Sequence, residues 1–184
     1  LDVLPLTTQP TTSVTDEPIA DCPGYETLVD ELVAQLEMPY SPSGILVTGC
    51  AGVGKSRLGT CVAQRVKYEV HRVSVHDLVV KAAWSTDFDV LPPHNHMLIL
   101  DDVEAVVDNE QTRNDSERQL VRNAISVALD EMCRRQIPIL AFARTGNIPE
   151  LNKVGRLEKQ LAMPPPTQRQ REQILSSMLA ELDH

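Results

Sequence analysis

The chain of 184 residues has little of what marks proteins that bind nucleic acids or cross membranes. Its 17 Lys and Arg are outnumbered by 26 Asp and Glu, which gives a formal net charge of −9. Phosphate backbones are held chiefly by clustered basic side chains, so direct nucleic-acid binding is not expected to be the main role. No apolar run approaches the roughly 18 residues that a membrane helix needs, and the sequence has no signal-peptide pattern. We therefore expect no transmembrane segment.

The cysteines and histidines are too scattered to suggest a metal centre. The cysteines are Cys22, Cys50, Cys61 and Cys133. They include no C-x-x-C pair, and no paired histidine spacing accompanies them, so neither a zinc site nor a disulfide framework is indicated. Free thiols in a reducing compartment are expected instead. His94 and His96 form an H-x-H pattern in a proline-rich connection, which we interpret as solvated loop histidines rather than metal ligands.

The most informative segment that is present is rich in glycine. Residues 49–56 read Gly-Cys-Ala-Gly-Val-Gly-Lys-Ser, after the apolar run 45–48 and before a segment with helical periodicity, which is the P-loop pattern. Its glycines let backbone N–H groups approach phosphate oxygens, and the following helix aims its positive end at the same anion. The expected nucleotide-binding residues of the loop are Gly49, Cys50, Ala51, Gly52, Val53, Gly54, Lys55 and Ser56. Lys55 should reach the β- and γ-phosphates, and Ser56 should bind Mg²⁺.

A second segment ends in two carboxylates. Residues 97–102 read Met-Leu-Ile-Leu-Asp-Asp, as expected for a buried parallel strand that delivers acids to its carboxyl end. This is a Walker B pattern, in which Asp101 joins the nucleotide site by holding the Mg²⁺ shell beside the P-loop hydroxyl. Asp102 would orient or deprotonate an attacking water. An ordinary strand end is the alternative, although the position after a P-loop favours the functional interpretation.

The remaining pattern predicts one α/β domain with short additions at both ends. Residues 1–20 are rich in Thr and Pro and are expected to be a flexible lead-in, residues 21–166 the nucleotide-binding domain, and residues 167–184 the start of a helical lid. Strands alternating with helices imply a parallel sheet covered on both faces, with the ligand at its carboxyl edge. Helical periodicity is predicted at 25–36, 77–84 and 116–135, and strands at 45–48, 70–75, 97–101 and 137–143.

In their order and spacing, four segments resemble the large subdomain of an AAA+ ATPase, a P-loop NTPase. They are residues 49–56, 98–104, 139–151 and 155–175. The resemblance implies ATP and Mg²⁺ as cofactors, a homo- or hetero-hexamer with other AAA subunits, and a protein substrate or adaptor. It places Asn147 at the sensor-1 position, with Thr145 as the alternative. It also gives Arg156 a catalytic role as an arginine finger acting on a neighbouring subunit, against the alternative of a solvated surface arginine.

The chain also departs from the pattern of active members. Asp102 stands where Glu is usual, and the aromatic pore loop that grips polypeptide is missing, since Trp84 and Phe88 are the only aromatics available there. Only one of two usual arginines is present, with Lys153 near the place of the other. The helical lid is expected to be mostly absent. These departures favour a nucleotide-gated assembly module with weak hydrolysis over the alternative of a fully active ATP-hydrolysing unfoldase.

Three short segments resemble the first ATPase cassette of tandem, or type II, AAA proteins. They are residues 101–104, 128–132 and 165–171. The Pex1-type subunit of the peroxisomal receptor-export motor is the nearest of these, while a ribosome-maturation or membrane-fusion cassette matches about as well. The implied setting is protein transport in the cytoplasm, with attachment to the peroxisomal membrane through partners. Outside the family, a P-loop kinase of small substrates is the alternative.

Overall fold

A computed structural model describes residues 22–38, 44–74, 96–101, 103, 115–146, 151 and 156–182. The expected lead-in at 1–20 and the predicted helix at 77–84 lie outside the described residues, as do Trp84 and Phe88. Among the residues described, no helix combines the length and the apolar character needed to cross a membrane.

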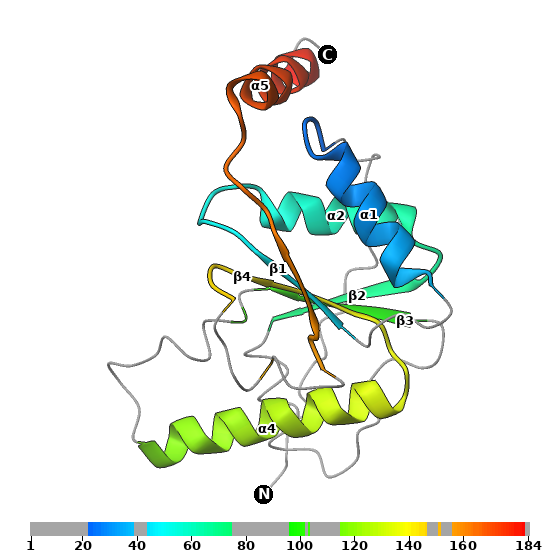
Figure 1. Cartoon of the computed structure of the whole chain (residues 1–184), viewed down its shortest axis with the longest axis vertical. Helices are drawn as coiled ribbons and strands as arrows, with labels where there is room; N and C mark the ends of the chain where they lie inside the picture. The colour runs from blue at the N-terminus through cyan, green and yellow to red at the C-terminus, as the bar shows by residue number, and fades with distance from the viewer. Residues whose placement is uncertain are drawn as a thin grey trace, which may run out of the picture.

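A parallel sheet lies between two layers of helices (Figure 1). The described strands are β1 Gly44–Thr48, β2 Glu69–Ser74, β3 His96–Asp101, β4 Ile139–Ala143 and β5 Lys159–Ala162. Their order across the sheet is β2-β3-β4-β1-β5. The helices are α1 Glu26–Leu36, α2 Lys55–Arg65, α4 Asp115–Arg134 and α5 Gln168–Leu182. This arrangement confirms the predicted α/β fold of a P-loop NTPase.

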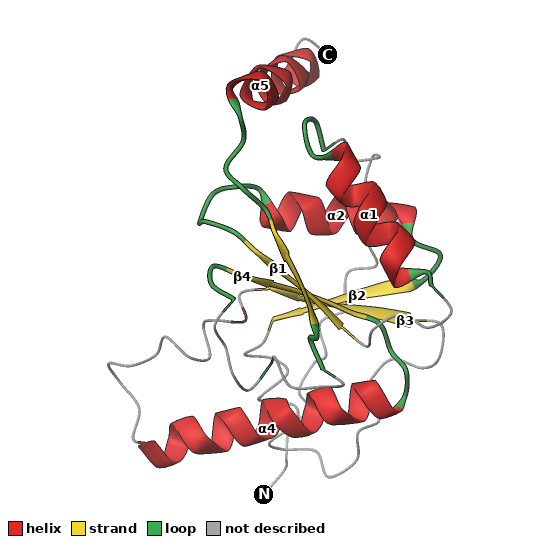
Figure 2. Cartoon of the chain, viewed as in Figure 1, coloured by secondary structure: helices red, strands yellow, loops and turns green. Residues whose placement is uncertain are grey.

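Each face of the sheet has its own core, because neighbouring side chains on a strand point to opposite faces. Ile45 and Val47 of β1 pack in the cluster that includes α1 and α2, whereas Leu46 packs in the cluster that includes α4. All five residues of β4 are buried, as expected for a central strand covered on both sides. Figure 2 shows α1 and α2 on one side of the sheet and α4 on the other.

The strand boundaries differ from the predicted ones by one or two residues. β4 begins at Ile139 rather than at Ile137, because Pro138 has no N–H to donate to a strand ladder. The carbonyl of Pro138 still accepts a hydrogen bond from the N–H of Leu98. His96, which was predicted to be a solvated loop residue, is instead the first residue of β3 and pairs with Glu69 of β2.

Candidate functional site

The P-loop turns tightly between β1 and α2. Gly52 has φ +77° and Gly54 has φ +101°, in the left-handed region that favours glycine. Gly54 is the N-cap of α2, and no described side chain forms a capping hydrogen bond there. The first N–H groups of α2 have no partner within the helix, so they are the donors that an anion such as phosphate would use.

Lys55 is folded back into the loop that precedes it. Its Nζ donates hydrogen bonds to the carbonyl oxygens of Gly49, at 2.7 Å, and Cys50, at 2.9 Å. An ammonium has three N–H donors, so two hold the loop in its turn and the third can meet a ligand. The positive charge therefore lies beside the amino-terminal end of α2, and the loop and the helix together attract an anion.

Asp101 is held by an arginine that sequence analysis did not single out. Nε of Arg72 donates to Oδ2 of Asp101 at 2.5 Å. The same guanidinium donates from Nη1 to Oγ1 of Thr60 at 3.1 Å and from Nη2 to the carbonyl oxygen of Ser56 at 2.9 Å. Arg72 thus joins the carboxyl end of β3 to the first turns of α2. It brings the two expected Mg²⁺-binding residues, Ser56 and Asp101, to one side chain.

The position of Arg72 follows from strand alternation. It shares a face of β2 with Val70, which packs in the α1 and α2 cluster, so its side chain points toward α2. The side chains of Arg72 and Asp101 are 29% and 25% exposed, which leaves water access to the pair. An arginine on the same strand face as the buried Val70 was the signal available in the sequence, and it points to a polar partner on the neighbouring strand.

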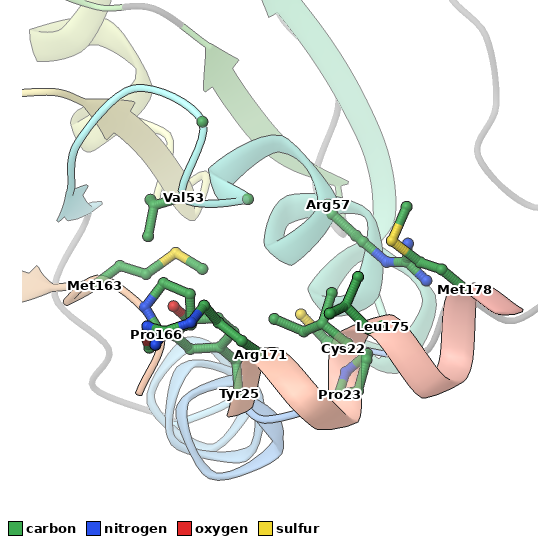
Figure 3. A pocket seen from close by; sticks show the side chains of 13 residues that line it. Cys22, Pro23, Tyr25, Val53, Arg57, Met163, Pro166, Arg171, Leu175 and Met178 are labelled. Carbon is green, nitrogen blue, oxygen red and sulfur yellow. Dashed lines mark hydrogen bonds between the residues drawn. The ribbon is translucent and has the colours of Figure 1, made fainter. Parts of the chain in front are cut away.

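A cavity of about 410 Å³ lies next to the P-loop. Its walls are mostly apolar and come from the turn before α1, the P-loop, the segment after β5, and α5 (Figure 3). Lining residues include Cys22, Tyr25, Val53, Met163, Leu175 and Met178. The resemblance predicts the turn 22–24 near the adenine of a nucleotide, and Cys22 and Pro23 do line this cavity. A flat heteroaromatic ring suits such an apolar slot beside a phosphate loop.

The four cysteines, all among the described residues, form no disulfide with one another. A hydrogen bond to Cys61, followed by burial, raises the pKa of the Cys22 thiol well above its usual range. The Cys22 thiol therefore lines the cavity in its protonated form and is not a nucleophile. Tyr25 donates from its hydroxyl to the carbonyl oxygen of Pro164 at 2.9 Å, and burial raises its pKa as well.

Arg156 lies in an intramolecular ion pair. It is 6% exposed, and its Nε and Nη2 donate to Oδ1 and Oδ2 of Asp130 at 2.6 and 2.7 Å. Nη1 donates to Oγ of Ser126 at 3.1 Å. The alternative of a solvated surface arginine is therefore wrong. A finger role on a neighbouring subunit would require these hydrogen bonds to α4 to break.

The described residues include only part of the expected catalytic set. Asp102 and Asn147 lie outside them, so the water-orienting and sensor roles stay predictions. Thr145, the alternative sensor, is an exposed residue just after β4. The P-loop, Asp101 and Arg72 are gathered at the carboxyl edge of the sheet, where parallel α/β folds bind their ligands.

Comparison with known proteins agrees with this geometry. The sequence profile of the ATPase family associated with various cellular activities (AAA) matches residues 45–165. The proteasome-activating nucleotidase of Methanocella arvoryzae is 27% identical over 206 residues, covering 95% of this chain and 49% of that protein. Fidgetin-like protein 1 of Drosophila melanogaster is 24% identical over 156 residues, covering 78% of this chain and 29% of that protein.

An uncharacterized AAA domain-containing protein of Schizosaccharomyces pombe is 22% identical over 191 residues, covering 89% of this chain and 24% of that protein. The chain thus spans a quarter to a half of the length of these curated relatives. The family profile covers more than half of the chain and includes both phosphate-site segments. The chain belongs to the AAA family of ATPases.

Proposed function

We propose that this chain is the ATP-binding module of a ring-forming protein-remodelling AAA ATPase, and that it serves mainly in nucleotide-dependent assembly, with weak hydrolysis. The observation that carries the proposal is the pair of basic side chains around the P-loop. Lys55 lies in the P-loop, where it would bind phosphate. Arg72 donates a hydrogen bond to Asp101, the carboxylate that would hold Mg²⁺. The first arrangement favours nucleotide binding, and the second opposes fast turnover.

The described residues fit MgATP. The uncapped amino-terminal end of α2 and the ammonium of Lys55 are donors for phosphate oxygens, and the apolar cavity beside them accepts a base. The hydroxyl of Ser56 and the carboxylate of Asp101 are the hard oxygen ligands that Mg²⁺ prefers. When bound, the metal and nucleotide would supply an electrophilic phosphoryl group.

Arg72 and Mg²⁺ would compete for the carboxylate of Asp101. A carboxylate that already accepts a charged hydrogen bond must give it up, or rotate, before a cation can approach it. Asp102, one methylene shorter than the usual Glu, is the proposed water-orienting residue, and its shorter reach would slow hydrolysis further. Arg156, bonded to Asp130, would have to leave α4 to assist a neighbouring subunit. All three features support assembly over rapid turnover.

Binding is tested with a fluorescent ATP analogue in the presence of Mg²⁺. We expect Lys55→Ala to weaken affinity by about 100-fold, because a charged hydrogen bond to phosphate contributes about 1.5–3 kcal/mol. Lys67→Ala is the matched control, since Lys67 is an exposed lysine paired with Glu37 far from the P-loop turn. Equal affinity of Lys55→Ala and the wild-type chain would overturn the proposed phosphate site.

For the cellular setting, we propose protein transport at peroxisomes through partner AAA subunits. The support is the resemblance of residues 101–104, 128–132 and 165–171 to a type II cassette of the peroxisomal motor. The test is the location of the tagged full-length protein in cells with and without peroxisomes. A location that does not depend on peroxisomes would contradict this setting and leave the nucleotide site untouched.

A further inference from the structure

Two histidines and a glutamate meet at the amino-terminal ends of β2 and β3. Glu69 and His96 begin these strands and are paired in register, and His71 follows Glu69 by two residues on the same face. This end of β3 is opposite the end that carries Asp101, about 16 Å away at about 3.3 Å per residue. The phosphate site does not use this cluster.

The three side chains lie on the sheet face that α4 covers. Val73 of β2 and Leu98 of β3 pack in the core cluster on that face, and Glu69, His71 and His96 are in phase with them. Among the strands that the structure describes, β2 lies at the edge of the sheet, with β3 as its neighbour. The cluster therefore sits where the sheet meets solvent.

The distances between the donor atoms lie on either side of those in a metal site. Nε2 of His71 and Nδ1 of His96 are 2.6 Å apart. The carboxylate oxygens of Glu69 lie 4.0 Å from Nε2 of His71 and 3.8 Å from Nδ1 of His96. Zinc with bonds of about 2.0–2.2 Å in tetrahedral geometry needs ligand atoms about 3.4 Å apart. The observed distances bracket this value, so small side-chain rotations would admit the ion.

The setting of the residues also suits a cation. The side chains of His71 and His96 are 25% and 15% exposed, so both rings are held by the protein, while that of Glu69 is 62% exposed and leaves a path from solvent. Within the described part of the chain, these three residues form a group whose donor atoms all lie within 4.8 Å of one another.

We propose that Glu69, His71 and His96 bind one Zn²⁺ ion, with water in the fourth position, and that the ion fastens β2 to β3. Imidazole nitrogen and carboxylate oxygen are ligand types that zinc takes. Such an ion would bridge the two strands and restrain β2, which has one neighbour among the described strands.

The test is calorimetric titration of the tag-free, reduced chain with ZnCl₂. We expect one ion per chain, and at least tenfold weaker binding in His71→Gln, His96→Gln and Glu69→Gln. The matched control is the triple variant His76→Gln/His94→Gln/His184→Gln, which changes the three histidines outside the described residues and should bind as the wild-type chain does. With Co²⁺ in place of Zn²⁺, the absorption spectrum should show four-coordinate metal without a thiolate charge-transfer band.

Other outcomes would overturn the proposal. The absence of stoichiometric binding, or binding that survives both single histidine substitutions, would reduce His71 and His96 to a hydrogen-bonded pair. A thiolate band with Co²⁺, lost in Cys50→Ser, would place the ion at that exposed cysteine instead. Circular dichroism checks the fold of each variant. If His96→Gln does not fold, the test rests on Glu69→Gln, which changes an exposed side chain. Unchanged zinc affinity in that variant would contradict the three-ligand site.

Discussion

Arg72 is the residue whose replacement should change the nucleotide site most selectively. Arg72→Gln removes the charged hydrogen bond to Asp101 while leaving the P-loop and Lys55 in place. A charged hydrogen bond is worth about 1.5 kcal/mol, so the Mg²⁺ concentration needed for half-maximal ATP retention should fall by up to about tenfold. The measurement is nucleotide retention across a Mg²⁺ series.

Arg65→Gln serves as the control for that measurement. Arg65 is an exposed arginine at the end of α2, bonded to Asp30, and its loss should leave the Mg²⁺ dependence unchanged. A higher Mg²⁺ requirement in Arg72→Gln would mean that the arginine helps to hold the metal site rather than competing for it.

Replacing Asp130 should destabilise the fold more than replacing its ion-pair partner Arg156. Asp130→Ala removes the carboxylate that pairs with a guanidinium only 6% exposed, and breaking such a pair by removing one partner costs about 3–5 kcal/mol. Arg156→Leu leaves an aspartate whose side chain is 61% exposed and easily solvated, so its effect on the free energy of unfolding should be smaller. Urea unfolding measures both.

Asp30→Ala is the comparison for this pair. It breaks the exposed pair with Arg65, which should contribute no more than about 1 kcal/mol. Equal destabilisation by Asp130→Ala and Asp30→Ala would show that the bonds of Arg156 are not maintained in solution, which would return Arg156 to the role of a trans-acting finger.

At the scale of elements, α2 packs unusually close to β4 because of a glycine. A Cβ added to Gly59 would lie 2.8 Å from Cε2 of Phe142, which is 1% exposed, and 3.3 Å from Nη2 of Arg72. Alanine would gain up to about 1 kcal/mol of helix propensity, but crowding a packed core costs about 1–3 kcal/mol. We expect Gly59→Ala to lower the free energy of unfolding, by up to about 2 kcal/mol. A more stable variant in thermal unfolding would contradict this packing.

The carboxyl-terminal end of α4 carries a pH-dependent contact. Hydrogen bonds from Arg134 and Arg135 lower the pKa of Glu131 from its usual 4.5 to about 2. A carboxyl with a lowered pKa in the folded state contributes stability above its unfolded pKa and loses it as pH falls toward the folded value. The difference in urea midpoint between the wild-type chain and Glu131→Gln should therefore shrink between pH 4.5 and pH 2. A difference that is constant over this range would rule out the contact.

The elements differ in how far the sequence alone could predict them. Apolar periodicity identified α1, α4 and the central strands to within two residues, because burial on one face or both dictates their composition. The P-loop and Asp101 followed from local motifs. The contact of Arg72 with Asp101 and the cluster around His96 follow from the register of β2 and β3, and the Arg156 pair follows from the packing of α4 on the segment before β5, so none of them can be predicted from a local motif.

At the scale of the whole molecule, the two ends of one sheet carry different chemistry. The carboxyl ends of the strands gather the phosphate site, and the amino ends of β2 and β3 gather Glu69, His71 and His96. α5 adds a further feature, since Leu175 and Leu179 are 59% and 62% exposed although Ile174 packs on the core. Leu175 also lines the cavity beside the P-loop, so α5 contributes to the proposed nucleotide site.

The most direct test of that role is single-turnover hydrolysis of prebound MgATP over a series of protein concentrations, with Lys55→Ala as the background. The proposed assembly module should form larger particles with ATP, while the bound ATP stays largely unhydrolysed at every concentration. Turnover that rises steeply with protein concentration would contradict it. That result would identify an active interfacial site in which Arg156 leaves Asp130 to act on a neighbouring subunit.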